Sequence, residues 1–137
     1  MKVLMADLDY LARTVYGEAR GESFAGKVAV ACVMLNRAAS AHRGERRIVG
    51  VVTEPWQFSC WNESDPNLSK ILSVDLSDQA FRACVSACMA AFDALADGRD
   101  PTRGALHYHA DGVAPRWAEG RHPCAVIGAH RFYNDIA

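Results

Sequence analysis

The sequence predicts an α+β fold, in which a compact helical body carries a small antiparallel sheet. Two observations point to it. Three runs with helical hydrophobic spacing occupy the first hundred residues, and short, aromatic-rich, strand-like segments at 106–110 and 125–133 follow Pro101. At 137 residues the chain is long enough for one hydrophobic core and too short for two, so we expect a single domain over residues 1–137.

Two helices are predicted in the first forty residues. The first is expected from Asp7, a suitable N-cap, to about Arg20, with an apolar stripe of Leu8, Leu11, Ala12, Val15 and Ala19. The second covers 24–39, and its centre is apolar on all sides, which indicates a helix buried on most of its faces. Asn36 and Arg37 end this run with polar groups, and such a position often lies beside a cleft.

A third helix is the clearest element of the chain. We expect Ser77 to cap it and Gly98 to end it, with a buried stripe of Phe81, Cys84, Val85, Cys88, Phe92 and Leu95. The stretches 40–47 and 62–76 are polar and are expected to be loops. The short run between them, 48–53, is β-branched.

Charge and hydropathy exclude several classes of function. The 15 basic and 16 acidic residues give a net charge of −1, which argues against a protein whose main task is to bind nucleic acid or an anionic membrane. No apolar run approaches the ~20 residues that span a bilayer, so we expect no membrane insertion. The N-terminus lacks the longer apolar core and cleavage site of a signal peptide, so we expect synthesis in the cytoplasm.

The five cysteines predict free thiols rather than a disulfide framework. An odd number leaves one unpaired in any complete scheme, and none of them forms a CxxC pair. Cys84 and Cys88 lie four residues apart on the predicted third helix, where small buried thiols are common. We therefore expect cysteines that fill the core of a protein in a reducing compartment.

Glu18 is the first candidate for a chemical role. It continues the apolar stripe of the first helix, so its carboxyl group is expected to be half withdrawn from water. Desolvation raises the pKa of a carboxyl group and lets it act as a general acid near neutral pH. Gly17 and Gly21 have no side chains and would let a polymeric substrate approach the backbone. The alternative is that Glu18 and Glu22 are solvated residues at a frayed helix end.

The segment WQFSCW alternates aromatic and polar side chains. Trp56, Phe58 and Trp61 provide flat apolar surfaces, and Gln57 and Ser59 provide hydrogen-bonding groups between them. This combination suits a sugar ring, which has apolar faces and a polar rim. Taken alone, the pattern is more typical of an ordinary half-buried strand.

Histidines near the C-terminus offer a different site. On a strand, His107 and His109 would point to the same face, and together with His130 they could bind zinc. No helical HExxH motif occurs, and histidines on strands more often pack and form hydrogen bonds. We therefore expect no metal and no other cofactor.

Several motifs follow one another along nearly the whole chain. They are ARTVYGEARGE (12–22), Gly26, AVACVMLNR (29–37), QFSCW (57–61), DPTRGALHYH (100–109), Pro115, Trp117 and IGAHRFY (127–133). Together, and in this order, they resemble the SleB/CwlJ-type cell wall hydrolases. The resemblance implies a peptidoglycan hydrolase whose compact domain is related to lysozymes and lytic transglycosylases. It also implies that Glu18, the first glutamate of GEARGE, is the catalytic acid.

From this resemblance we expect cleavage of the glycan strand between N-acetylmuramic acid and N-acetylglucosamine, by a lytic transglycosylase with Glu18 as its single acid. The expected partner is the peptidoglycan glycan strand. The expected cleft walls are Gln57, Ser59, Trp61, His109 and Tyr133.

Two other functions stay open. One is an N-acetylmuramoyl-L-alanine amidase that uses zinc held by the histidines, and the other is a non-catalytic glycan-binding module with the same fold. Named members of the family carry a signal or a wall-binding module, and this sequence shows neither. We therefore expect a phage-endolysin-like domain that reaches the cell wall after release.

Overall fold

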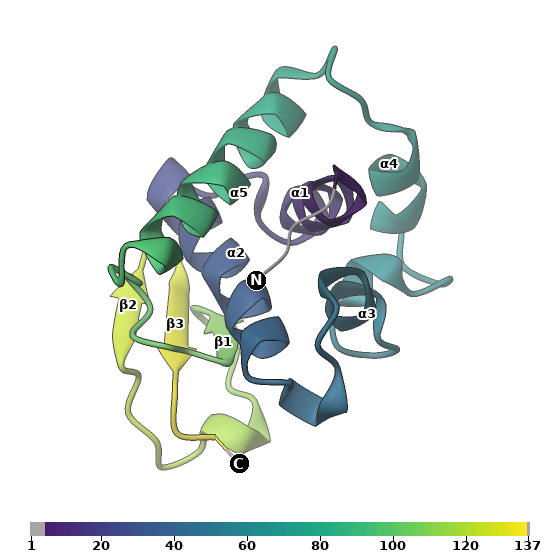
Figure 1. Ribbon diagram of the computed structural model, residues 1–137. Coiled ribbons are helices and arrows are strands. Elements are labelled where there is room, and N and C mark those ends of the chain that lie inside the picture. The colour runs from purple at the N-terminus through teal and green to yellow at the C-terminus, as the bar shows by residue number, and fades with distance from the viewer. Residues whose placement is uncertain (1–4, 137) are drawn as a thin grey trace.

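The structure is a computed structural model that describes residues 5–136, and in it a body of helices packs beside a small sheet (Figure 1). The helices are α1 (Met5–Ala19), α2 (Phe24–Ala39), α3 (Ile48–Thr53), α4 (Asn67–Ser73) and α5 (Gln79–Ala96). Short 3-10 turns are η1 (His42–Gly44), η2 (Ser59–Trp61) and η3 (Arg116–Ala118). The strands are β1 (His107–Ala110), β2 (Ala125–Ile127) and β3 (His130–Tyr133). None of these helices has the length and apolar character needed to cross a membrane.

Helix α2 lies at the centre of the body. It packs against α1, α3 and α5 and against β1 and β2, and every residue from Ala29 to Leu35 is fully buried. Burial on all sides confirms the prediction for this helix. Its first turn is capped by Ser23, whose hydroxyl oxygen accepts a hydrogen bond from the backbone N–H of Gly26 at 3.1 Å.

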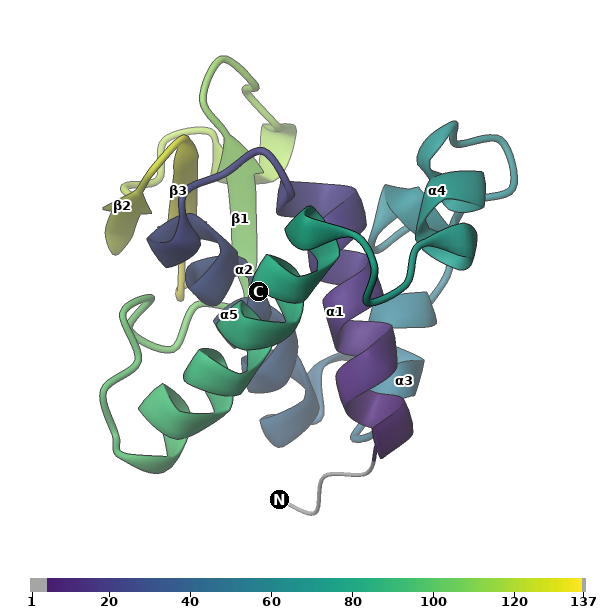
Figure 2. The same cartoon turned by 90° about the horizontal axis from the view of Figure 1, so that it is seen from above.

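Helices α1 and α5 pack against each other and against α2, and the sheet and α4 lie on opposite sides of α1 (Figure 2). The predicted ends need two corrections. Helix α1 begins at Met5, so Asp7 lies in its first turn and is not its N-cap. Helix α5 is capped by Asp78, whose carboxylate accepts the N–H of Phe81 at 3.0 Å, whereas Ser77 belongs to the preceding turn.

Two short helices lie where the periodic pattern of apolar residues is weak. The β-branched run forms α3 because Ile48, Val51 and Val52, at helical spacing, are buried against α1 and α2. The stretch 62–76 was expected to be a loop, but it contains α4, which buries Ile71 completely. Leu68 is half-buried beside it, and two apolar contacts in seven residues are too few to predict a helix from periodicity.

The sheet has the strand order β1-β3-β2, and all its pairings are antiparallel. Tyr108 is opposite Phe132 and Ala110 is opposite His130, so these side chains share one face. We call it the inner face, because Phe132 and His130 are buried there. His107 and His109 belong to the other, outer face.

The polar end of α2 holds the segment that leads into β1. The amide of Asn36 donates to the Asp100 carboxylate at 2.8 Å and to the Ala105 carbonyl at 3.2 Å. The guanidinium of Arg37 donates from Nε to the Leu106 carbonyl at 2.7 Å. These bonds fix where β1 begins relative to the helices.

All five cysteines are free thiols, as predicted. Cys32, Cys60, Cys84 and Cys88 are buried and Cys124 is half-buried. Burial raises the pKa of Cys32 and of Cys60 to about 12 and that of Cys84 to about 11.

Gly17 lies where α1 meets η2 and α4. A Cβ atom at this position would be 2.7 Å from Cys60 Cβ and 3.0 Å from Ile71 Cγ2. The space beside Gly17 is therefore filled by the protein's own side chains and not by substrate, contrary to the sequence-based expectation. Gly21 is different, because a Cβ atom there would meet nothing within 4 Å.

We therefore expect Gly17→Ala to lower the free energy of unfolding by about 1–3 kcal/mol, the usual cost of overpacking a core. Denaturant unfolding followed by circular dichroism measures this. Gly21→Ala is the matched control and should unfold at the wild-type midpoint or slightly above it. Equal midpoints for the two variants would contradict the close packing at Gly17.

Candidate active site

Glu18 lies in the last turn of α1, where this helix faces β1. It lies on the same side of the helix as the buried residues Leu11 and Val15, and its own side chain is half-buried. The hydroxyl of Tyr108 donates a hydrogen bond to Glu18 Oε1 at 3.2 Å. A carboxyl group from the helical body and a hydroxyl group from the sheet therefore meet at the junction of the two.

The surroundings of Glu18 favour its protonated form. Burial raises the pKa of Glu18, and the negative charge of Asp65 raises it further, whereas the hydrogen bond from Tyr108 acts in the opposite direction. The net effect is a pKa above the usual value for a glutamic acid. The prediction of a desolvated carboxyl group on the buried flank of α1 is thereby confirmed.

Tyr108 is a fixed hydrogen-bond donor. Its ring packs edge-on against His130, with centroids 5.2 Å apart, and lies 5.8 Å from the ring of Phe132. Burial raises the pKa of Tyr108 well above its usual value, and the neighbouring charge of Glu18 adds to this. The phenol therefore keeps its proton near neutral pH, and its hydroxyl can donate a hydrogen bond to Glu18.

Asp65 is the second carboxylate that acts on this site, and the sequence did not single it out. It lies just before α4, where its Oδ1 accepts the backbone N–H of Asn67 at 2.8 Å. Its segment was expected to be a polar loop, and a lone aspartate in such a loop carries no periodic signal. Only the folded chain brings its charge close enough to affect Glu18.

The WQFSCW segment forms a turn followed by η2, and not a strand. Cys60 packs on Gly17, so η2 lies directly against the part of α1 that carries Glu18. Gln57 Oε1 accepts a long hydrogen bond from Arg37 at 3.4 Å, and Ser59 is exposed.

Trp61 turns toward α1 rather than into open space. Its ring stacks on Tyr10 with centroids 5.4 Å apart, and its Nε1–H donates to Thr14 Oγ1 at 2.9 Å. Both partners lie on α1, one and two turns before Glu18. These contacts make Trp61 a support for η2.

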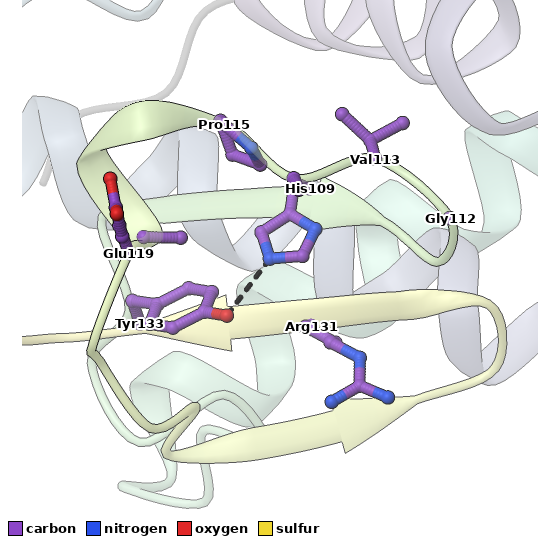
Figure 3. A pocket seen from close by; sticks show the side chains of 9 residues that line it. His109, Gly112, Val113, Pro115, Glu119, Arg131 and Tyr133 are labelled. Atoms are coloured by element: carbon purple, nitrogen blue, oxygen red, sulfur yellow. Dashed lines mark hydrogen bonds between the residues drawn. The ribbon is translucent and has the colours of Figure 1, made fainter.

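His109 and Tyr133 lie together on the outer face of the sheet, as Figure 3 shows. The structure does not bring them to Glu18, because Tyr108 points to the inner face and its neighbours in the strand point to the outer one. They line an open pocket of about 630 Å³, to which the loop after β1 contributes Val113 and Pro115.

The His109–Tyr133 contact has a defined direction. His109 Nδ1 faces the Ala110 carbonyl at 2.9 Å and therefore carries a proton. In the neutral ring, Nε2 is then the acceptor, and the Tyr133 hydroxyl donates to it at 2.8 Å. The phenol oxygen keeps its lone pairs for a further partner in the pocket.

The three histidines of the zinc alternative do not converge. His107 and His109 belong to the outer face and His130 to the inner face, where its Nδ1 lies 3.4 Å from Glu22 Oε1. Across residues 5–136, no three histidine, cysteine or acidic side chains are grouped so that they could hold a metal ion. The proposed ligand set is thus divided between the two faces of the sheet.

Glu22 connects the α1–α2 turn to the β2–β3 turn. Its Oε1 accepts the backbone N–H of Ala129 at 3.1 Å. The neighbouring Gly128 has a φ of +58°, and a Cβ atom there would lie 2.9 Å from the same oxygen. Glu22 is therefore neither a solvated residue at a frayed end nor part of the Glu18–Tyr108 pair.

The fold and this site define a class of protein. A helical body with a small sheet, and a desolvated glutamate where they meet, is the arrangement of lysozyme-like enzymes, in which apolar surroundings keep a glutamic acid protonated. The profile of the Cell Wall Hydrolase family matches residues 21–133. The chain belongs to this family, so the resemblance of its motifs is confirmed and it is an enzyme domain.

Curated relatives are similar over nearly the whole chain. A spore cortex-lytic enzyme of Halalkalibacterium halodurans is 35% identical over 129 residues, which are 93% of this chain and 34% of that protein. A spore cortex-lytic enzyme of Bacillus subtilis is 34% identical over 127 residues, 92% of this chain and 37% of that protein. The chain thus spans little more than a third of the length of these relatives. Each match is longer than the part of the chain that follows Glu18, so each match includes Glu18.

Solved structures of two similar domains share the fold. The catalytic domain of the germination-specific lytic transglycosylase SleB from Bacillus anthracis has a TM-score of 0.73 and 30% identity, covering 96% of this chain and 97% of that chain. The catalytic domain of the Bacillus cereus SleB protein has a TM-score of 0.71 and 30% identity, covering 97% and 93%. These similarities confirm the predicted lysozyme-like α+β fold.

We expect Tyr108→Phe to raise the pKa of Glu18 further, because the lost hydrogen bond stabilises the ionised carboxylate. Carbon-detected NMR titration of the glutamate side chains measures this directly. Tyr16→Phe is a suitable control, since Tyr16 lies on the same helix as Glu18 but its ring packs on Phe81. A Glu18 pKa that stays the same or falls in Tyr108→Phe would show that this hydroxyl does not donate to the carboxylate.

Proposed function

We propose that this domain cleaves the glycan strand of peptidoglycan between N-acetylmuramic acid and N-acetylglucosamine, as a lytic transglycosylase with Glu18 as its acid. The observation that carries the proposal is the raised pKa of Glu18 at the junction of α1 and β1. Membership of the cell wall hydrolase family supports peptidoglycan as the substrate, and the similarity to the lytic transglycosylase SleB of Bacillus anthracis supports the reaction type.

In the first step Glu18 protonates the glycosidic oxygen. Because the Tyr108 hydroxyl donates to Oε1, that oxygen is an acceptor and the acidic proton belongs on Oε2. Proton transfer from Oε2 breaks the bond between the anomeric carbon and the leaving oxygen, and positive charge develops on the muramyl ring. The negative charge of Asp65 stabilises the positive charge on this ring. The same charge favours the protonated form of Glu18 before the step.

In the second step the Glu18 carboxylate acts as a base. It takes the proton of the muramyl 6-hydroxyl, whose oxygen attacks the anomeric carbon of the same ring, so a 1,6-anhydro bond forms and Glu18 regains its proton. During this interval Tyr108 stabilises the carboxylate through the bond to Oε1. No second protein group is required for the proton balance.

A hydrolysing enzyme would need a second carboxylate to activate water or to bind the sugar. Glu22 is poorly suited to this role, because its carboxylate is held by Ala129 beside His130. Asp65 is the better candidate, since its charge acts on Glu18. Hydrolysis through Asp65 is therefore the alternative that an experiment must separate from transglycosylation.

The proposal includes the walls of the cleft. Gln57 and Ser59 belong to the segment that packs beside Glu18, and we assign them to substrate contacts, with Trp61 holding η2 in place. His109 and Tyr133 would contact only a part of the substrate that reaches the outer pocket.

Glu18→Gln should reduce the lysis of purified cell walls at least ~100-fold, because an amide cannot donate the proton. The fold should be retained. The raised pKa means that Glu18 contributes stability below its usual pKa and that this contribution is lost as the pH rises through the folded-state value. A neutral glutamine avoids this loss, so the melting temperature at neutral pH should equal or exceed that of the wild type.

Glu22→Gln is the matched control for this variant. A glutamine oxygen can still accept the N–H of Ala129, so lysis should fall much less than in Glu18→Gln. Near-normal lysis by a correctly folded Glu18→Gln protein would remove Glu18 from the role of the acid.

Products formed in heavy-oxygen water separate the two reaction types. We expect 1,6-anhydromuramyl ends without the label, detected by mass spectrometry, because the nucleophile is the substrate's own hydroxyl group. Asp65→Asn should then change the rate but not the product. Labelled reducing ends that disappear in Asp65→Asn would instead establish hydrolysis with Asp65 as the second carboxylate.

A further inference from the structure

Trp56 has an unusual backbone conformation and an unusual degree of exposure. Its φ is +67°, in the left-handed region that glycine adopts freely and that a bulky side chain rarely occupies. Its side chain is also 80% exposed. The chain therefore holds a large aromatic ring in water, on a strained backbone, immediately before the segment that carries Gln57 and Ser59.

Packing does not compensate for this strain. Trp61 stacks on Tyr10, and Trp117 packs against His107 and Tyr133, but the ring of Trp56 stacks on no aromatic ring and lies under no cation in residues 5–136. Strained residues of this kind persist where the surroundings fix them, and they concentrate at binding sites.

The backbone on either side of Trp56 is firmly held. The N–H of Gln57 donates to the Glu54 carbonyl at 3.2 Å, and Phe58, only 2% exposed, lies under the guanidinium of Arg37 at 5.0 Å. The exposed ring therefore projects from a rigid base.

The position of Trp56 relates it to the candidate active site. It lies four positions before Cys60, which packs on Gly17 next to Glu18. Even a fully extended chain of that length spans only ~14 Å. A polymer bound at Glu18 would thus need to continue over only a short distance to reach the ring.

The charges around Trp56 favour a neutral ligand. Arg43 pairs with Glu54 at 2.9 Å, and Arg47 pairs with Glu45 at 3.0 Å, so among the three arginines of this loop only Arg46 forms no salt bridge within residues 5–136. An anionic lipid surface would require a cluster of unpaired cations here. An indole face without a strong local charge matches the apolar face of a sugar ring.

We propose that Trp56 is a binding platform for a sugar ring of the glycan strand, at a subsite away from the bond that Glu18 cleaves. This proposal rests on the proposed function, because it takes the glycan strand as the substrate. Trp56 takes no part in the chemistry. It holds a distant ring of the polymer and thereby keeps the cleaved bond in register with Glu18.

The test uses replacements that separate strain from binding. Trp56→Gly removes the platform and also relieves the backbone strain, so its melting temperature should rise by about 3 °C while its affinity for soluble, uncleaved glycan strands falls about tenfold. Trp56→Tyr keeps a flat ring and should retain most of the affinity. Binding is measured by calorimetry with Glu18→Gln in every protein, so that no strand is cut.

Two controls match the two effects. Arg103→Gly relieves a similar left-handed conformation, with φ +57°, at a site distant in sequence, and should raise the melting temperature without changing the affinity. Leu72→Ala removes another exposed apolar side chain, 62% exposed on α4, and should leave the affinity unchanged. With Glu18 intact, Trp56→Gly should raise KM for soluble strands and leave kcat near the wild-type value.

The outcomes distinguish this proposal from the proposed function. Wild-type affinity in Trp56→Gly, together with normal lysis by the parent protein, overturns the platform and leaves the proposed function standing. Equal losses in Trp56→Gly and Leu72→Ala overturn it as well, and so does binding of the parent to anionic phospholipid vesicles that depends on Trp56 while glycan binding does not. A parent protein that neither binds nor cleaves glycan strands overturns both proposals.

Discussion

The buried polar end of α2 is the constraint on which the rest of the structure depends. Arg37 is only 7% exposed, so its buried N–H groups need hydrogen-bond acceptors. The guanidinium donates to the Leu106 carbonyl and to the Gln57 amide oxygen, and it also lies over the ring of Phe58. It thereby ties the approach to β1 and the turn before η2 to the same helix. Because both are fixed to α2, Tyr108 meets Glu18 across the junction at hydrogen-bond distance.

Most of the helical body could be predicted from the sequence, because its helices carry strong periodic patterns. The all-round apolar centre of α2 and the stripes of α1 and α5 are burial patterns that any packed structure must satisfy. The helix ends were less predictable, since Ser77 and Asp78 are both good caps and only the final geometry decides between them. Helix α4 was missed because it is short and only Ile71 is fully buried, with Leu68 half-buried beside it.

The site was only partly predictable, for a different reason. The desolvation of Glu18 follows from its place on the stripe of one helix, so local periodicity was enough to find it. Tyr108 and Asp65 act on Glu18 from distant parts of the chain, and no local pattern contains that proximity. Alternation along the strand already separates His109 from Tyr108, but only the packed fold decides which of the two faces meets α1.

The thiols have a consequence for the conditions under which the protein can work. A thiol reacts with oxidants, metals and disulfides mainly as the thiolate, and the raised pKa values of Cys32, Cys60 and Cys84 keep that form scarce near neutral pH. Their burial also keeps small reagents away. The fold contains no disulfide that reduction could break, and these three side chains offer little for oxidation to attack. A change in redox potential would therefore leave their packing intact.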